Sequence, residues 1–381
     1  MHSHSRRGFL GKTLGAAWSG ATILERAALV ATRARAQSKA PLPILFDVEK
    51  VADGVYAAVA NGRALINCNA AIFENANDLL IVDAHSAPSA VYSLVAQIRK
   101  QITEKPVRYV VATHLHGDHT QGLPAYRSIA PKADIIASAK TRSLMVELGP
   151  ARLKAAVDAV PRSIDNLSRK LSSAKSAEER AYYREMIDQS KAFLEEMRNV
   201  PVELPNVTFD DQLTIHDKAH DLHLSFRGRA HTAGDIVVAC PAKKVVASGD
   251  VLHSFFPTIG DGYPSEWPAT LRSLQQLEFE KVIGGHGGVL DSPQRAGQLR
   301  DYLDELLEIV TRAKHDGVPL DRLQQTVNPG SLKSLQGGYG DYLADEVKKH
   351  DFRVYLSTHA QVLAAGVRDN LAAVYRNYQR A

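Results

Sequence analysis

Short apolar runs and longer periodic stretches alternate along this chain and predict both strands and helices. Runs rich in Val, Ile and Leu are typical of β-strands, whereas apolar residues that recur every three or four positions are typical of helices. Strands are expected at residues 55–60, 70–73, 78–83, 107–112, 135–137, 213–215, 222–226, 236–239, 245–247 and 281–283. Helices are expected at residues 88–101, 269–277, 292–314 and 352–379. Two runs of strands, each followed by helices, favour an α+β fold in which two sheets pack face to face beneath outer helices.

Residues 139–200 interrupt this alternation and predict a helical insertion. The segment is rich in Ala, Lys, Arg and Glu and carries a mostly apolar stripe at helical spacing. The stripe consists of Tyr183, Met186, Ser190, Phe193 and Met197. An apolar helix face usually packs on its own domain, which is the favoured interpretation, but a substrate lid or a dimer contact stays open.

The first 36 residues have the features of an export signal. Residues 5–10, Ser-Arg-Arg-Gly-Phe-Leu, resemble the twin-arginine motif, and a weakly apolar stretch leads to the small residues Ala34 and Ala36 at a cleavage-type site. Residues 37–44 then form a Pro-containing linker. An amphipathic helix of the folded domain is the alternative. We expect a periplasmic or secreted protein without a membrane span, since Glu25 and Arg26 interrupt the apolar stretch.

Composition and charge indicate an ordinary globular protein. The 381 residues carry a formal charge of +4, but residues 1–36 hold six basic side chains and one acidic one. The remainder keeps 40 of the 46 basic and 41 of the 42 acidic side chains and is close to neutral, so no nucleic-acid partner is expected. The two cysteines, Cys68 and Cys240, favour buried free thiols, although a single bridge between them stays open.

Residues 114–119 read His-Leu-His-Gly-Asp-His and predict a metal site. His114, His116, Asp118 and His119 directly follow the expected strand 107–112, and no packing demand explains so many lone-pair donors in six residues. Imidazole and carboxylate are ligands that suit zinc, and alternate side chains of such a turn can point to two adjacent ions.

Three further metal-capable side chains also follow expected strands. His231 lies beyond strand 222–226, Asp250 ends the run that begins with strand 245–247, and His286 follows strand 281–283. Neighbouring glycines allow sharp backbone turns at these strand ends. If the strand ends meet at one edge, five histidines and two aspartates come together.

The order of these motifs resembles the metallo-β-lactamase superfamily over about residues 45–295. This resemblance implies a four-layer αββα sandwich, with residues 296–381 as a C-terminal helical extension packed on it. It also implies a dinuclear metal site at one sheet edge. In that site His114, His116 and His231 would bind one metal, and Asp118, His119 and His286 would bind the other. Asp250 would bridge both metals.

The expected activity is that of a dinuclear zinc hydrolase acting on a small molecule. Two zinc ions can share a hydroxide that attacks an ester-, lactone-, thioester- or amide-like bond, while Asp118 orients or shuttles the proton. Asp250 resembles the bridging aspartate of glyoxalase-II-like members, and β-lactamases of the superfamily tend to lack it. An iron-dependent oxygenase of the same fold, a β-lactamase and a non-catalytic metal-binding protein remain alternatives.

Other side chains are weaker candidates. Asp83, at a strand end, is expected either to accept a hydrogen bond from a ligand histidine or to be an ordinary turn residue. His253 can line the pocket or pack beside it. The loop at residues 255–264 is expected to border the site, with Tyr263 as a candidate substrate contact, whereas Trp267 is expected to cover the core. Residues His216, His220 and His223 are expected at the surface.

Overall fold

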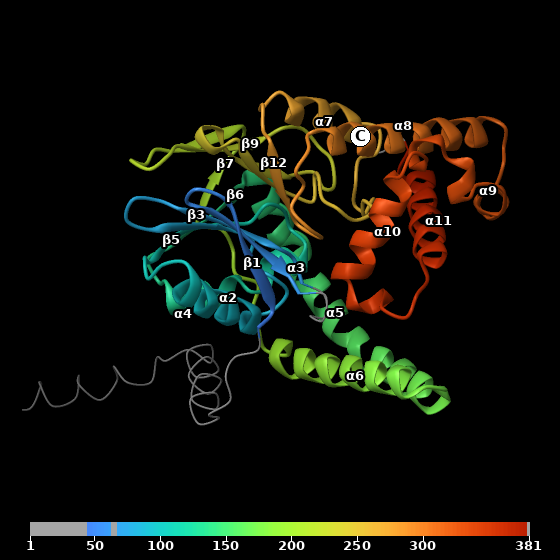
Figure 1. The fold of residues 1–381 in the computed structure, drawn as a ribbon, viewed down its shortest axis with the longest axis horizontal. Helices are drawn as coiled ribbons and strands as arrows, with labels where there is room; N and C mark the ends of the chain where they lie inside the picture. Colours follow the sequence, from blue (N-terminus) through green and yellow to red (C-terminus); the bar gives the residue numbers. More distant parts are fainter. Residues whose placement is uncertain (1–43, 62–66, 379–381) are drawn as a thin grey trace, which may run out of the picture. The chain divides into compact units, whose positions relative to one another are not determined.

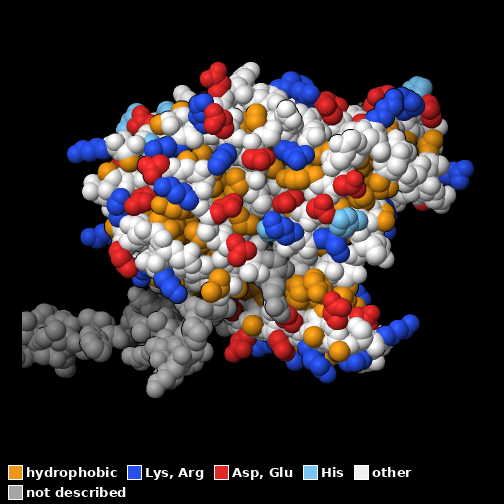
Figure 2. Space-filling view, in the orientation of Figure 1, with side chains coloured by type: hydrophobic (Ala, Val, Ile, Leu, Met, Phe, Trp, Pro, Cys, Tyr) orange, Lys and Arg blue, Asp and Glu red, His pale blue; other side chains and the backbone are white. Residues whose placement is uncertain are grey.

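The computed structural model describes residues 44–61 and 67–378. The expected export signal and nearly all of the linker that follows it lie outside these ranges. The helices within the described ranges are all too short or too polar to cross a membrane. Lys and Arg side chains alternate with Asp and Glu side chains over the face that Figure 2 shows, in keeping with the near balance of charge.

Seven strands form the first sheet in simple sequential order. The first four strands pair antiparallel, and the pairs from β4 to β7 are parallel. The strands are β1 (Phe46–Ala52), β2 (Val55–Ala60), β3 (Ala70–Glu74), β4 (Leu79–Val82), β5 (Val107–Val111), β6 (Asp134–Ser138) and β7 (Val207–Phe209).

Five strands form the second sheet, in the order β12-β11-β10-β9-β8. Only the β11–β12 pair is parallel. The strands are β8 (Gln212–Ile215), β9 (Leu222–Phe226), β10 (Ile236–Cys240), β11 (Val245–Gly249) and β12 (Lys281–Gly284). A 3₁₀ turn, η1 (Pro241–Lys243), joins β10 to β11.

Alternate residues of each central strand face opposite layers. In β4, Leu80 and Val82 enter the core between the sheets, whereas Leu79 and Ile81 enter the core beneath the outer helices. Strand β10 does the same, because Ile236, Val238 and Cys240 face the first sheet while its other residues face helices. This period of two fills three successive hydrophobic layers and confirms the expected αββα sandwich.

Helices cover the outer faces of both sheets (Figure 1). The first sheet is covered by α2 (Pro88–Gln101) and α4 (Leu123–Ile129), and the short α3 (Gly117–Thr120) lies between β5 and α4 in the chain. The second sheet is covered by α7 (Trp267–Gln275) and α8 (Gln294–His315). The C-terminal helices α9 (Leu320–Thr326), α10 (Tyr339–His350) and α11 (His359–Asn377) and the turn η3 (Lys333–Leu335) extend the same hydrophobic core. The short η2 (Pro329–Ser331) lies between α9 and η3 in the chain.

The insertion forms two helices, α5 (Ala139–Ser173) and α6 (Ala177–Met197). Each begins at a serine whose side chain accepts a hydrogen bond from the backbone of the first turn. Residues of α6 pack against the segment η4 (Phe352–Val354) near the C-terminal helices.

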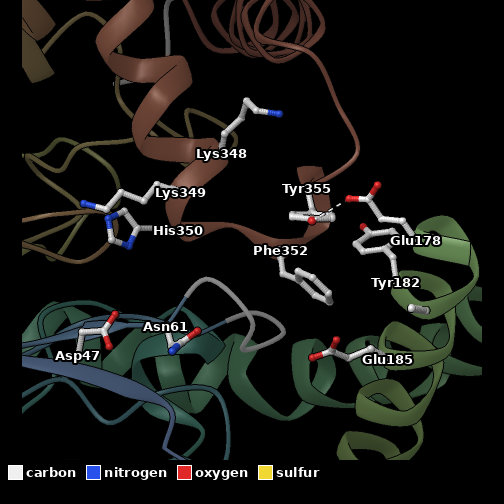
Figure 3. A pocket seen from close by; sticks show the side chains of 11 residues that line it. Asp47, Asn61, Glu178, Tyr182, Glu185, Lys348, Lys349, His350, Phe352 and Tyr355 are labelled. Carbon is white, nitrogen blue, oxygen red and sulfur yellow. Dashed lines mark hydrogen bonds between the residues drawn. The ribbon is translucent and has the colours of Figure 1, made fainter.

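Aromatic rings dominate the contact between α6 and η4. The Tyr182 ring lies 4.9 Å from the Phe352 ring and 5.9 Å from the Tyr355 ring, centroid to centroid. The Tyr182 hydroxyl donates a hydrogen bond to the backbone carbonyl of Arg353 over 2.9 Å. Figure 3 shows these rings at one end of a cavity of about 430 Å³, with Asp47 of β1 and Asn61, which follows β2, at its other end. The insertion is therefore joined to the C-terminal part of the chain.

The expected elements were incomplete, and one of them was wrong. Strand β1 was not expected, because it is an edge strand with few buried positions and carries little apolar signal. The expected helix 352–379 is instead broken into η4 and α11. Asp351 caps η4 and Thr358 begins α11 in a capping box with Gln361, so two helix starts replace one.

Candidate metal centre

The metal-capable side chains lie together at one edge of the two sheets. His114 follows β5, Asp118 and His119 lie on α3, and Asp250 and His286 follow the parallel strands β11 and β12. Parallel strands present their carboxyl ends at the same edge, which gathers residues far apart in sequence. Only a glycine fits at position 285, because a Cβ there would collide with the Asp250 carboxylate and lie 2.7 Å from Cε1 of His119.

Three imidazoles form the first group of donor atoms. Nδ1 of His116 lies 3.1 Å from Nε2 of His114 and 2.7 Å from Nε2 of His231. Their rings meet nearly edge to face, and one ligand nitrogen of each ring lies within 4.8 Å of the others. Burial lowers the pKa of His114 well below its ordinary value and lowers the pKa of His231 to about 3. Both rings are therefore neutral and keep a lone pair for a metal.

The second group combines a carboxylate with two imidazoles. Oδ2 of Asp118 lies 3.2 Å from Nε2 of His286 and 3.7 Å from Nε2 of His119. Burial alone would raise the pKa of Asp118, but the two histidines hold it below its usual range. The Asp118 carboxylate is ionised at neutral pH.

Asp250 lies between the two groups. Its Oδ1 is 3.5 Å from Nε2 of His119, and its Oδ2 is 3.4 Å from Nε2 of His231 and 3.5 Å from Nε2 of His286. Although burial would raise the pKa of Asp250, the surrounding histidines lower it well below the usual range. One carboxylate thus reaches donor atoms of both groups.

The donor set fits metal ions. Nε2 of His119 and Oδ1 of Asp250 are buried and have no hydrogen-bond partner among the described residues. A buried polar atom left unsatisfied costs about 1–3 kcal/mol, and a cation would satisfy both atoms. Imidazoles and carboxylates without a thiolate are ligands that suit zinc and also iron.

Hydrogen bonds to the outer ring nitrogens orient two of the imidazoles. Nδ1 of His119 donates to Oδ2 of Asp83 over 2.8 Å, and Nδ1 of His231 donates to the carbonyl of Thr258 over 2.8 Å. Asp83 also accepts hydrogen bonds from the backbone and hydroxyl of Thr113, each at 2.9 Å. Asp83 has a positive φ of 69°, a conformation that aspartate tolerates better than most residues.

Asp261, which also lies behind a candidate ligand, was not predicted from the sequence. Its Oδ2 accepts hydrogen bonds from Nε2 of His116 over 2.8 Å and from Nη1 of Arg152, in α5, over 2.6 Å. The loop at 255–264 was expected beside the site, and the only sequence signal for Asp261 was an acidic residue between two glycines.

The weaker candidates occupy different places. His253 is buried and its ring centroid lies 5.6 Å from that of His286, so it packs beside the centre. Tyr263 is buried beneath the guanidinium of Arg229, which lies 4.5 Å from its ring centroid. Trp267 is fully buried in the core, as expected.

The expectation that three histidines lie at the surface was wrong for one of them. His216 and His223 are exposed, but His220 is only 5% exposed. Its ring packs 6.4 Å from that of Phe73, centroid to centroid, because the turn between β8 and β9 folds back over the first sheet. Cys68 and Cys240 are buried free thiols, as favoured by the sequence.

Comparisons with known proteins agree with this architecture. A family model described as the metallo-beta-lactamase superfamily matches residues 64–286. A metallo-beta-lactamase from Pontibacter korlensis is 17% identical, with a TM-score of 0.50, over 68% of this chain and 99% of that one. The DIM-1 metallo-beta-lactamase is 18% identical, with a TM-score of 0.49, over 68% of this chain and 97% of that one. At such identities the likeness to the Pontibacter structure concerns the fold alone.

Proposed function

Because the chain belongs to the metallo-β-lactamase superfamily, we propose that it is an exported dinuclear zinc hydrolase of a small molecule. The bond cleaved is ester-, lactone-, thioester- or amide-like. The observation that carries this proposal is the place of Asp250, whose two carboxylate oxygens face donor atoms of both groups. A carboxylate in that position can bridge two cations and offset their charge.

Different residues of the chain would bind each metal ion and orient the ligands. His114, His116 and His231 would hold one ion, and Asp118, His119 and His286 would hold the other, with Asp250 shared. Bound there, zinc would supply Lewis acidity and would bring the pKa of a coordinated water toward about 7. Asp83 and Asp261 fix the orientation of His119 and His116 by accepting hydrogen bonds from their outer nitrogens.

Asp118 is suited to handle the proton. Its side chain is 24% exposed and borders a cavity, whereas Asp250 is buried. Because the Asp118 carboxylate is ionised at neutral pH, it can accept a proton from water and pass it to a leaving group.

The proposal is tested with a panel of lactone, thioester, carboxylic ester, phosphoester and β-lactam substrates on zinc-loaded protein. We expect turnover of at least one acyl substrate. His116→Ala and Asp118→Ala should each reduce kcat/KM by at least about 10²-fold, since each removes a ligand. His216→Ala removes an exposed histidine and is the matched control. Unchanged activity in either ligand variant would refute the site.

An iron-dependent oxygenase is the second candidate, because the same nitrogen and oxygen donors accept iron. Substrate-dependent oxygen uptake by the iron-loaded protein, without hydrolysis by the zinc-loaded protein, would favour it.

Export rests on the sequence of residues 1–36. Replacing Arg6 and Arg7 together by lysine should retain the full chain in the cytoplasm of a bacterial host, whereas normal export of this variant would refute the proposed route.

A further inference from the structure

A cavity of about 640 Å³ opens directly beside the proposed zinc centre. Gly117 and Asp118 of α3 form one end, and the two insertion helices α5 and α6 form most of its wall. In Figure 1, α5 passes α3 and leads to α6. The volume lies within the range of about 300–1,000 Å³ that is typical of small-molecule sites.

The wall of this cavity is mainly apolar and follows one face of α5. Leu153, Ala156 and Val160 lie three or four residues apart and therefore share that face. Met186 and Phe193 of α6 line the opposite side. Met186, Ser190 and Phe193, three of the five residues expected to form an apolar stripe, thus line a space next to the centre, and small alanines on α5 leave room for a ligand.

The charged side chains of the cavity already have partners. Arg152 donates to Asp261 over 2.6 Å, Arg353 donates to Asp351 over 2.6 Å, and Asp118 faces His286 at 3.2 Å. Among the described lining residues, no charge is left without a counter-charge. The lining therefore offers no unpaired charge to attract an anionic or cationic occupant, which favours a neutral, apolar one.

We propose that this cavity binds the apolar acyl chain of the substrate and that the enzyme prefers medium-chain acyl esters to acetyl esters. The inference rests on the proposed hydrolase function. In the reaction, water adds across the acyl carbon–oxygen bond. The acyl group leaves as a carboxylic acid carrying the oxygen of water, and the alcohol oxygen takes a proton. The chain in the cavity holds the acyl carbon beside Asp118.

Binding is tested first, on metal-free protein. N-phenyl-1-naphthylamine, a neutral apolar fluorophore, is titrated into the full chain and then displaced with methyl octanoate or methyl acetate. Methyl octanoate should displace the probe at a concentration at least about tenfold lower, because each buried methylene improves binding by roughly fourfold. Equal displacement by the two esters would overturn the inference.

Two matched variants locate the binding. Ala156 lines the cavity, whereas Ala151 lies on the same helix, is also solvent-exposed and does not line it. Ala156→Phe should weaken displacement by methyl octanoate roughly tenfold, and Ala151→Phe should leave it unchanged. Equal effects of the two substitutions would contradict binding at this wall. A thermal unfolding midpoint close to that of the wild type verifies that each variant folds.

A comparison of kcat/KM for two esters then tests whether the cavity takes part in the reaction. With zinc-loaded protein, the ratio of kcat/KM for p-nitrophenyl octanoate to that for p-nitrophenyl acetate should exceed about ten, and Ala156→Phe should lower it. Hydrolysis of both esters at equal efficiency would overturn the inference and leave the hydrolase proposal standing. Probe binding that depends on Ala156, without turnover of any acyl substrate of the panel, would sink the hydrolase proposal instead and leave the binding of an apolar ligand in the cavity standing.

Discussion

At the scale of single residues, the centre depends on side chains that do not themselves face the metal position. Asp261 links His116 to Arg152 of the insertion, and Asp83 links His119 to Thr113. Each carboxylate fixes which nitrogen of its histidine carries the proton, so the other nitrogen keeps its lone pair. The orientation and basicity of these candidate ligands are therefore set by the carboxylates behind them.

Removing Asp261 should weaken metal binding without removing a ligand. Asp261→Ala is expected to lower zinc affinity by roughly 10- to 100-fold, since His116 loses the acceptor that orients it. Competition against a chromophoric zinc chelator measures the change. Asp221→Ala removes a comparable aspartate–histidine pair far from the centre and should have no effect. Equal affinity of Asp261→Ala and the wild type would contradict this role.

The buried imidazole of His85 should make the free energy of unfolding depend on pH. Burial lowers the pKa of His85 to about 3, and its Nδ1 donates to the carbonyl of Cys68 over 2.9 Å. The unfolded chain takes up this proton near pH 6.5, so stability is present above that pH and is lost as pH falls toward 3. His85→Asn keeps a residue that tolerates the positive φ of 62° and removes the titration.

Chemical denaturation in the presence of a chelator, at several values between pH 7 and pH 4, measures this effect. Between about pH 6 and pH 4 the wild-type free energy of unfolding should fall more steeply than that of His85→Asn, by up to about 1.4 kcal/mol per pH unit. Parallel curves for the two proteins would show that His85 is not the group responsible.

Some residues of this candidate centre could be predicted from the sequence, and others could not. His114 to His119 form a dense local motif, and His231, Asp250 and His286 each follow a recognisable strand. Asp261 could not be found in the same way, because its hydrogen bond to His116 joins positions 145 residues apart in a loop without periodicity. Tyr263 comes from the same loop and its ring lies beneath Arg229, and its role as a substrate contact stays a prediction.

At the scale of elements, the insertion places α5 and α6 beside the centre and joins them to η4. Tyr182 lies in the middle of this contact and is 7% exposed. The sequence predicted the helices and the apolar stripe of α6, yet could not show which surface the stripe meets. The partner, Phe352, lies in a segment that was expected to be helical and is instead a short turn between two helices.

Tyr182→Ala should loosen the insertion while leaving the metal ligands in place. Loss of the ring contacts and of the hydrogen bond to Arg353 is expected to destabilise the α6–η4 contact by about 2–4 kcal/mol. Limited proteolysis should then cut the α5–α6 connection, residues 174–176, faster than in the wild type. Tyr182→Phe keeps the ring and should behave nearly as the wild type. Equal cleavage rates in all three proteins would refute the contact's role.

At the scale of the whole molecule, three hydrophobic layers hold the two sheets and their outer helices in one arrangement. That arrangement was predictable because strands of period two and helices of period 3.6 alternate in a regular order. The edge strand β1 and the helix α10 were not predictable, since one has few buried residues and the other starts after two glycines with positive φ. This arrangement brings the carboxyl ends of β5, β11 and β12, and the side chains that follow them, to one edge of the sheets.

We propose that this edge holds two zinc ions bridged by Asp250, and the metal content of the protein tests this proposal most directly. Elemental analysis of full-length protein, purified from a bacterial host without added metal, should find about two zinc ions per chain. Asp250→Ala should lower this number, because both groups of donors lose a shared ligand. One iron ion per chain in the wild type, or an unchanged zinc content in Asp250→Ala, would contradict the account.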